Sequence, residues 1–183
     1  MICIASTQFE DIYKECVIAS PAWLIHRDDF QKCNGFESPL YPEDYDLVFR
    51  FYKAGIKVVS SLNIVHQWRD HGQRASRNDP NYKDNNFFEL KIKYFLDIDF
   101  NVNKELSLLG AGRKGKEIAR KLIENNIPFK WYTNNPKKIG VNIYNLIIKN
   151  NDSFFPSGQT IVAISNPEQL QDIKEKLSKN DQQ

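Results

Sequence analysis

A chain of 183 residues is long enough for one medium-sized domain or two small ones. Hydrophobic residues make up 41% of it and aromatic residues 13%, which is enough for a packed core and argues against a disordered chain. The net charge of +2 is too small to indicate a nucleic-acid-binding surface.

The cysteines and the apolar runs bear on where the protein is located. Cys3, Cys16 and Cys33 are odd in number and form no CxxC pair, which argues against a disulfide framework or a zinc site and favours a reducing compartment. No apolar run approaches the roughly 20 residues of a membrane span. The N-terminal residues also lack the basic and apolar regions of a signal peptide. We therefore expect a cytoplasmic protein.

The first half of the chain reads mostly as helices joined by loops. Apolar spacing over residues 9–17 is roughly helical, and Ala22–Ile25 reads as a short buried strand leading into a turn or short helix. Residues 43–54 have helical spacing, with Gly55 placed to end that helix. β-branched residues over 56–68 predict strands, and residues 69–85 form a polar loop before a second helical pattern at 87–100.

A boundary near Asn101–Lys104 separates this part from a β-α-β pattern. Residues 105–126 read as a strand, a glycine turn and an amphipathic helix. Two further strands follow, at 127–133 and 160–164, and a helical pattern follows the second of them. Residues 1–100 have 12 Lys and Arg against 15 Asp and Glu, whereas residues 101–183 have 13 against 8. We therefore predict an α/β fold with two domains, 1–100 and 104–183.

Three carboxylates lie at the start of the helix predicted at 43–54: Glu43, Asp44 and Asp46, directly after Pro42. Acids in a first helical turn suit the free N–H groups and the positive end of the helix dipole, so a purely structural role is open for all three. Alternatively, a carboxylate in this position is a general base.

A cationic loop about twenty residues further on favours the chemical interpretation. It contains His66, Arg69, His71, Arg74, Ser76 and Arg77. Arginine binds phosphate oxygens through a planar fork, and histidine and serine add donors. A carboxylate facing such a loop suits a reaction in which the acid deprotonates a hydroxyl while the loop stabilises a departing diphosphate.

Residues 17–95, with this acidic motif and this loop in order, resemble the C-terminal half of the catalytic domain of family 2 glycosyltransferases, which have the GT-A fold. The resemblance implies that Asp44 is the base of an inverting transfer from a nucleotide sugar to a glycan or lipid-linked acceptor. It implies that Glu43 and Asp46 position the acceptor or the helix. Arg69, His71, Arg74 and Ser76 would lie on the diphosphate side, with His71 also a candidate ligand of a divalent metal, Mg²⁺ or Mn²⁺.

The chain departs from that family before the matching region. The family's nucleotide-binding β/α unit and its DxD metal motif precede this region, but here only about sixteen residues do. Asp28 and Asp29 follow the expected strand and are not read as the DxD. We therefore expect a donor-binding half to come from elsewhere, and little transfer by this chain alone. A lipid-linked acceptor leaves peripheral membrane association of the full enzyme open.

The glycine turn is a second candidate site. Gly110, Gly112 and Gly115 form a GxGxxG pattern between an apolar strand and a helix, the context in which such turns hold a pyrophosphate. The acid that usually follows the next strand and binds ribose hydroxyls is missing, and Asn134 is the weaker candidate there. Glycines kept for packing alone are the alternative.

The pattern after residue 104 resembles small Rossmann-like units appended to sugar-modifying enzymes, including some family 2 glycosyltransferases. Our first hypothesis is therefore a transferase part followed by a Rossmann-like accessory domain. The alternative is a non-catalytic nucleotide-binding module. An NAD-dependent oxidoreductase is disfavoured, because the ribose-binding acid and a hydride-transfer constellation are both missing.

Overall fold

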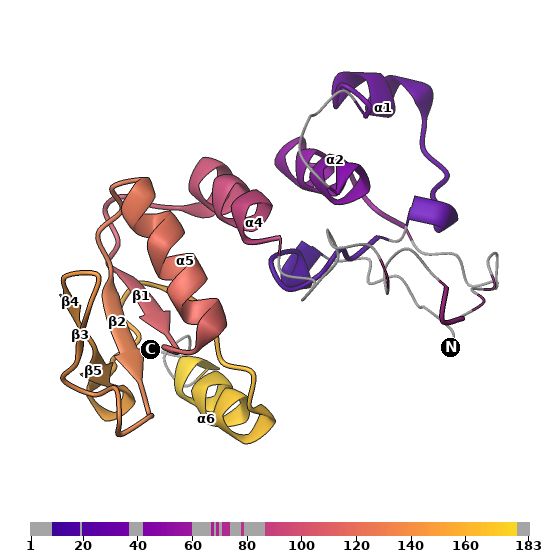
Figure 1. The fold of residues 1–183 in the computed structure, drawn as a ribbon. Coiled ribbons are helices and arrows are strands. Elements are labelled where there is room, and N and C mark those ends of the chain that lie inside the picture. The colour runs from indigo at the N-terminus through magenta and orange to yellow at the C-terminus, as the bar shows by residue number, and fades with distance from the viewer. Residues whose placement is uncertain are drawn as a thin grey trace. The chain divides into compact units, whose positions relative to one another are not determined.

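The computed structural model describes residues 9–18, 20–36, 42–59, 67, 69, 71–73, 78 and 87–178. The chain divides into two compact units, Met1–Ile98 and Asp99–Gln183 (Figure 1). Helices occur together with a four-stranded parallel sheet, so the predicted α/β class is confirmed. In the described part of the chain, no helix is both long and apolar enough to cross a membrane.

The first unit is built from helices and turns, with no strand among its described residues. Its elements are η1 (Phe9–Asp11), η2 (Ser20–Ala22), α1 (Arg27–Lys32), α2 (Glu43–Lys53), α4 (Phe88–Tyr94) and the π-helix η4 (Phe95–Asp99), whose last residue begins the second unit. Its core surrounds α2: Phe49 is completely buried, and its ring stacks on Tyr45 and Tyr94 at centroid distances of 5.0 and 4.6 Å. Helix α2 is therefore the central element of this unit.

Helix α2 begins and ends where the sequence predicts. Pro42, with φ of −74°, is the N-cap, and all three acids lie in the first turn. Gly55 has φ of +66°, a backbone conformation that glycine adopts without steric cost. Its N–H donates to the carbonyl of Tyr52, 3.0 Å away, which helps to close the C-terminus. The three carboxylates thus lie at the N-terminus of a helix whose two ends are both well defined.

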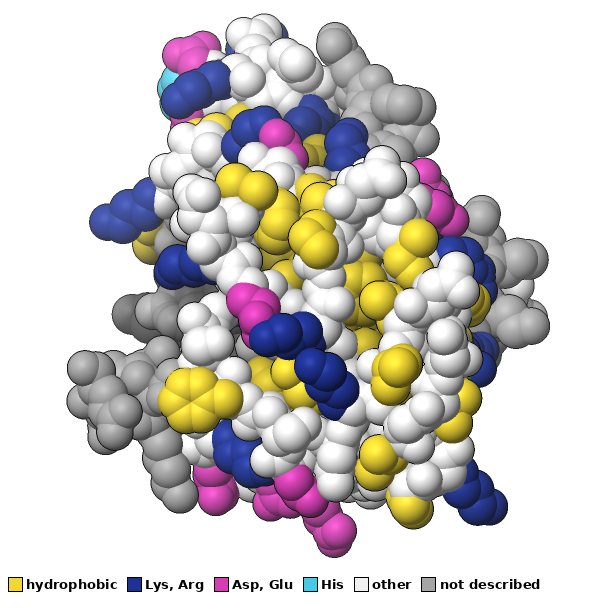
Figure 2. Space-filling model, turned by 90° about the vertical axis from the view of Figure 1, so that its left-hand side faces the viewer, with side chains coloured by type: hydrophobic (Ala, Val, Ile, Leu, Met, Phe, Trp, Pro, Cys, Tyr) yellow, Lys and Arg dark blue, Asp and Glu magenta, His cyan; other side chains and the backbone are white. Residues whose placement is uncertain are grey.

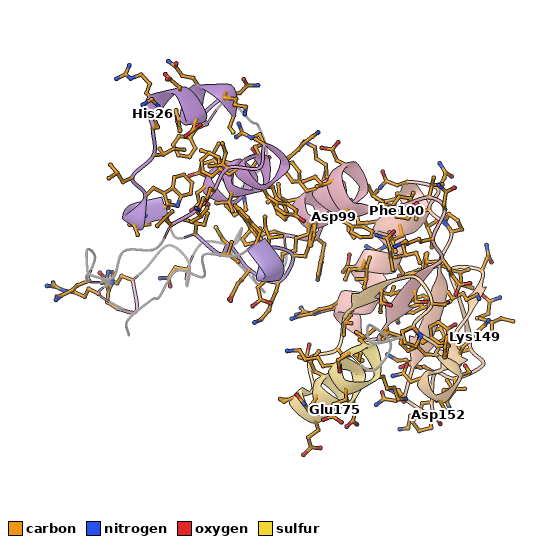
Figure 3. The ribbon with its side chains drawn as sticks, turned by 180° about the vertical axis from the view of Figure 1, so that it is seen from behind. His26, Asp99, Phe100, Lys149, Asp152 and Glu175 are labelled. Atoms are coloured by element: carbon orange, nitrogen blue, oxygen red, sulfur yellow. The ribbon has the colours of Figure 1, made fainter. Side chains whose placement is uncertain are left out.

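The strand predicted at Ala22–Ile25 is wrong. Ala22 ends the 3-10 helix η2, the next residues form no strand, and Leu24 is 102% exposed. A strand needs a backbone partner, and no described segment provides one here. His26 (labelled in Figure 3), directly after the predicted strand, is the exposed N-cap of α1. Its Nδ1 accepts from the Asp28 N–H at 3.3 Å.

Two further predictions for the first unit also differ from the structure. Phe9–Asp11 form a 3-10 helix followed by turns, not a longer helix. Residues 56–59 have no strand, and the remainder of the strand-rich segment lies outside the described residues except for Gln67. The short helix α1 and the helical pattern at 87–100 are confirmed.

The second unit contains the predicted strand, glycine turn and helix, followed by the other predicted strands. Its elements are β1 (Leu106–Leu109), α5 (Arg113–Glu124), β2 (Lys130–Thr133), β3 (Asn142–Ile143), β4 (Leu146–Ile147), β5 (Lys149–Asn150), η5 (Asn151–Ser153), β6 (Gln159–Val162) and α6 (Pro167–Ser178). The sheet has the order β5-β2-β1-β6 with every neighbouring pair parallel. The carboxyl ends of its strands therefore share one edge.

Both faces of β1 are buried, as expected for a parallel sheet covered by helices. Leu109 and Tyr132 pack with Phe154 and with Ile173 of α6. Leu108 lies beside Trp131 in the register, and their side chains alternate with those of Leu109 and Tyr132. Helix α5 lies across the sheet (Figure 1) and buries Ile118, Ala119 and Leu122.

The antiparallel hairpin β3–β4 was not predicted. Its two connecting residues, Tyr144 and Asn145, have φ of +54° and +63°. The Tyr144 ring stacks on Trp131 at a centroid distance of 6.2 Å, which anchors the turn on the sheet. Ile147 is 63% exposed, and hydrophobic side chains are visible at the surface from the side on which the hairpin lies (Figure 2).

Candidate functional site

The three acids at the start of α2 have different surroundings, and Asp46 is the buried one. Its side chain is 0% exposed. The Tyr94 hydroxyl donates to Oδ1 at 2.7 Å, and Arg50 Nε donates to Oδ2 at 2.9 Å. Arg50 Nη2 lies 2.8 Å from the same oxygen as an ion pair, without the alignment of a hydrogen bond. Both oxygens of Asp46 are therefore used within the fold, which favours the helix-positioning role over acceptor contact.

The phenol of Tyr94 belongs to the same buried cluster. Burial raises its pKa, and the hydrogen bond to Asp46 raises it further. Tyr94 therefore stays protonated and remains a donor to the carboxylate. Arg50 in turn donates through Nη1 to the carbonyl of Cys33, which connects α2 to the end of α1.

Asp44 is half-buried and its carboxylate is held by two donors. The Ser20 hydroxyl donates to Oδ2 at 2.9 Å, and the Tyr45 backbone N–H donates to Oδ1 at 2.8 Å. Donors to both oxygens fix the orientation of the carboxylate. Glu43, one residue earlier, is exposed. Asp44 is thus the ordered acid at this helix end that stays partly accessible.

The charge of Asp44 affects the pKa of a nearby thiol, that of Cys16. Burial raises the pKa of Cys16 to about 12, and the negative charge of Asp44 contributes to that shift. Its Sγ donates to the carbonyl of Ile18 at 3.4 Å. Because the nucleophile is the thiolate, a thiol with this pKa is unreactive at neutral pH. This agrees with a packing role for Cys16.

The cationic loop is described only in part. Arg69 and His71 are exposed, whereas Arg74 and Ser76 lie outside the described residues, as do His66 and Arg77. No hydrogen bond or ion pair between described residues joins Asp44 to Arg69 or His71. The roles of these loop residues stay predictions.

The described residues do not by themselves make a metal site. No three His, Cys, Asp or Glu side chains among them are grouped so that they could hold an ion. His71 would therefore need partner ligands from outside the described part of the chain. A divalent metal in a complete enzyme stays a prediction.

The glycine turn joins β1 to α5, and two of its glycines are required by packing. Gly110 has φ of +107°, and a Cβ there would lie 2.8 Å from the carbonyl oxygen of Ala163. A Cβ on Gly115 would lie 2.0 Å from the carbonyl oxygen of Gly110. By contrast, Gly112 has φ of −72°, and a Cβ there would meet no atom within 4 Å. The space beside Gly112 is therefore open.

Cationic groups gather at this turn. The first turn of α5 contains no acid but contains Arg113 and Lys114, against the usual preference at the positive end of a helix. Lys138, from the segment after β2, donates from Nζ to the carbonyl of Ala111 at 2.5 Å. The sequence analysis did not identify Lys138 as a candidate site residue. The only indication in the sequence is the pair of lysines that follows the second predicted strand. An anion at this turn would be attracted by all of these charges.

The residues after β2 offer amides where nucleotide-binding turns commonly have a carboxylate. Thr133 is buried, with Oγ1 accepting from the Asn135 N–H at 3.3 Å, and Asn134 is exposed. Trp131, earlier in the same strand, donates from Nε1 to the carbonyl of Gly110 at 2.9 Å. This bond fixes the backbone of the glycine turn against β2, a contact that the sequence did not reveal.

Comparison of the chain with protein-family models, with curated proteins and with solved structures found no match.

Proposed function

We propose that the chain is the acceptor-side part of an inverting glycosyltransferase with a GT-A-type catalytic domain, in which Asp44 is the general base. The observation that carries this proposal is that the acids at the start of α2 differ in burial and in hydrogen-bond partners. Asp46 is buried against Tyr94 and Arg50, whereas Asp44 is ordered but partly accessible. The proposal also rests on the resemblance of residues 17–95 to family 2 glycosyltransferases.

In this reaction Asp44 takes the proton of an acceptor hydroxyl as that oxygen attacks the anomeric carbon of the donor sugar. The bond from that carbon to the phosphate oxygen breaks, and the nucleoside diphosphate leaves from the opposite face. Ser20 and the Tyr45 N–H orient the carboxylate, since each donates to one of its oxygens. Arg69 and His71, with Arg74 and Ser76, are the proposed donors to the departing diphosphate. The donor-binding β/α unit would lie outside residues 1–183.

Substitution of Asp44 by Asn in a protein that also contains the donor-binding unit tests this role. Removal of the general base is expected to lower kcat by at least about 100-fold, while donor affinity stays unchanged. Turnover is measured by release of the nucleoside diphosphate, and donor affinity by calorimetry. Asp28→Asn is the matched control, because Asp28 is an exposed first-turn acid of another helix. Retained turnover in Asp44→Asn would refute the assignment.

A second function, binding of a nucleotide or another phosphorylated ligand, is proposed for the second unit. It is favoured by the open space at Gly112 beside Arg113, Lys114 and Lys138. The strand order reverses at β1, because β2 and β6 lie on opposite sides of it. In open parallel sheets ligands bind at such a reversal, outside the carboxyl ends of the strands. Together with the glycine turn, this order supports a Rossmann-like unit.

A thermal-shift comparison of the whole chain with NAD, UDP and a UDP-sugar tests this second function. A ligand of the glycine turn is expected to raise Tm by about 5 °C or more at about 100 times its Kd. Gly112→Leu fills the open space and is expected to abolish the shift, whereas Gly112→Ala should weaken it less. A metal-dependent response to UDP that is lost in Arg69→Ala would favour the first unit instead. No shift with any of the three ligands would count against the proposal.

A further inference from the structure

Strand β6 forms one side edge of the parallel sheet. It pairs with β1, and the Gln159 and Ala163 N–H groups donate to the carbonyls of Glu105 and Leu109, each at 2.8 Å. Alternate residues of a strand direct their backbone groups to opposite edges. The N–H and C=O groups of Thr160 and Val162 therefore face away from β1. No backbone hydrogen bond connects these two residues to any other described segment.

Among the described residues, this edge lacks the charged side chains and the proline that commonly prevent an edge strand from pairing with another strand. In natural proteins, charged side chains, proline or a very short length keep an edge strand from pairing with another chain. Residues 153–167 contain no Asp, Glu, Lys or Arg, the longest such run in the chain, and β6 itself contains no proline. Each of its four residues is half-buried. Strand β6 thus has an uncharged edge whose backbone groups pair with no described segment.

The opposite edge of the same sheet provides an internal contrast. Strand β5 is only two residues long, it contains the exposed Lys149, and the exposed Asp152 follows it (Figure 3). Shortness and charge protect this edge. The two edges of one sheet therefore differ both in length and in charge.

We propose that β6 pairs with β6 of a second copy of this chain, which makes a continuous eight-stranded sheet across a two-fold axis. Two-fold symmetry makes the two strands antiparallel and brings the same residues of both copies together. Like charges directly opposite each other in a sheet are destabilising, so a strand that pairs with itself must be uncharged. With the two-fold axis at Ile161, the two Ile161 side chains would form the central cross-strand pair, and Thr160 of each copy would lie opposite Val162 of the other. All three residues are of the β-branched type that stabilises sheets. This inference is independent of both proposed functions.

The molar mass of the full chain in solution, measured by light scattering after size-exclusion chromatography over a range of concentrations, tests the pairing. Twice the 21.4 kDa of one chain is expected at the higher concentrations. Thr160→Pro removes an outward N–H without removing a bond to β1, so it should give a single-chain mass with an unchanged circular dichroism spectrum. Thr160→Val keeps the N–H and should keep the double mass. A wild-type chain that stays at 21.4 kDa throughout overturns the proposal.

Amide hydrogen exchange in the wild-type chain tests the same edge without relying on a folded variant. The amides of Thr160 and Val162 should exchange slowly at high concentration and faster on dilution. The amide of Ile161 faces β1 and should exchange slowly at all concentrations. If Thr160 and Val162 stay protected where the measured mass is that of a single chain, residues of the same chain cover the edge and the proposal is wrong. Fast exchange at both amides in a dimer would place the interface elsewhere and overturn it as well.

Discussion

Replacement of Asp46 by alanine is expected to lower the free energy of unfolding of the first unit by about 3–5 kcal/mol. The change leaves the Arg50 guanidinium, whose side chain is only 17% exposed, without its carboxylate partner. It also leaves the Tyr94 hydroxyl without the acceptor that lies 2.7 Å away. An uncompensated buried charge and an unsatisfied buried donor are the two costs that make such single substitutions severe.

Urea denaturation of the wild-type chain and the Asp46→Ala variant, with hydrogen exchange read at the amides of α2, measures this loss for the first unit. Glu43→Ala is the matched control, because Glu43 lies in the same helical turn but is exposed. It should change the unfolding free energy by no more than about 0.5 kcal/mol. Asp46→Asn should fall between the two, since an amide oxygen still accepts from Tyr94. Equal losses in Asp46→Ala and Glu43→Ala would mean that the buried cluster contributes nothing.

The sequence predicts the start of α2 but not the division of roles among its acids. Pro42 and the clustered carboxylates are local signals, and the helix begins beside them as expected. The spacing of Asp46 and Arg50 is also a local signal, because side chains four residues apart on a helix are neighbours. Tyr94, however, lies 48 residues further along the chain, and nothing near Asp46 indicates that contact.

Apart from the helix expected over residues 9–17, the errors concern strands, which depend on partners far away in the chain. An apolar run such as Ala22–Ile25 has the composition of a buried strand, yet Leu24 is fully exposed in the structure. The reverse error occurs at the β3–β4 hairpin. Its turn residues, Tyr144 and Asn145, have positive φ, but a bulky residue such as tyrosine rarely adopts that conformation. Stacking on Trp131, a tertiary contact, accompanies this unusual turn.

The parallel sheet was the most predictable part of the fold. Three of its strands, β1, β2 and β6, are short and largely apolar, and the helix after the glycine turn has a clear amphipathic pattern. The two-residue edge strand β5, Lys149–Asn150, has no such signal and was not predicted. The GxGxxG pattern alone could not distinguish glycines needed for packing from a glycine that leaves room for a ligand. Backbone angles and neighbouring atoms distinguish them, and they assign Gly110 and Gly115 to packing and leave Gly112 open.

Gly115→Ala is therefore expected to destabilise the second unit by about 3 kcal/mol or more. In an ordinary helix interior, replacing glycine by alanine stabilises by roughly 0.5–1 kcal/mol. Here the added Cβ would lie 2.0 Å from the carbonyl oxygen of Gly110, so α5 or the turn must move. The turn resists movement, because the Gly110 N–H donates to Tyr132 at 2.8 Å and its carbonyl accepts from Trp131 at 2.9 Å. The steric overlap with Gly110, whose backbone is fixed by these two hydrogen bonds, therefore costs more than the gain in helix propensity.

Gly112→Ala separates this packing effect from a general intolerance of the turn to side chains. Its Cβ would enter open space at an ordinary backbone angle, so the change should cost no more than about 1 kcal/mol, the usual cost of alanine at an N-cap. Because two of the three tryptophans lie in the first unit, hydrogen exchange at the amides of α5 during urea denaturation is the readout that reports on the second unit. If both variants unfold at the same urea concentration, the close contact between α5 and the Gly110 carbonyl does not limit stability. Because Gly112→Ala is expected to stay folded, any ligand response that it loses can be attributed to the open space beside β1.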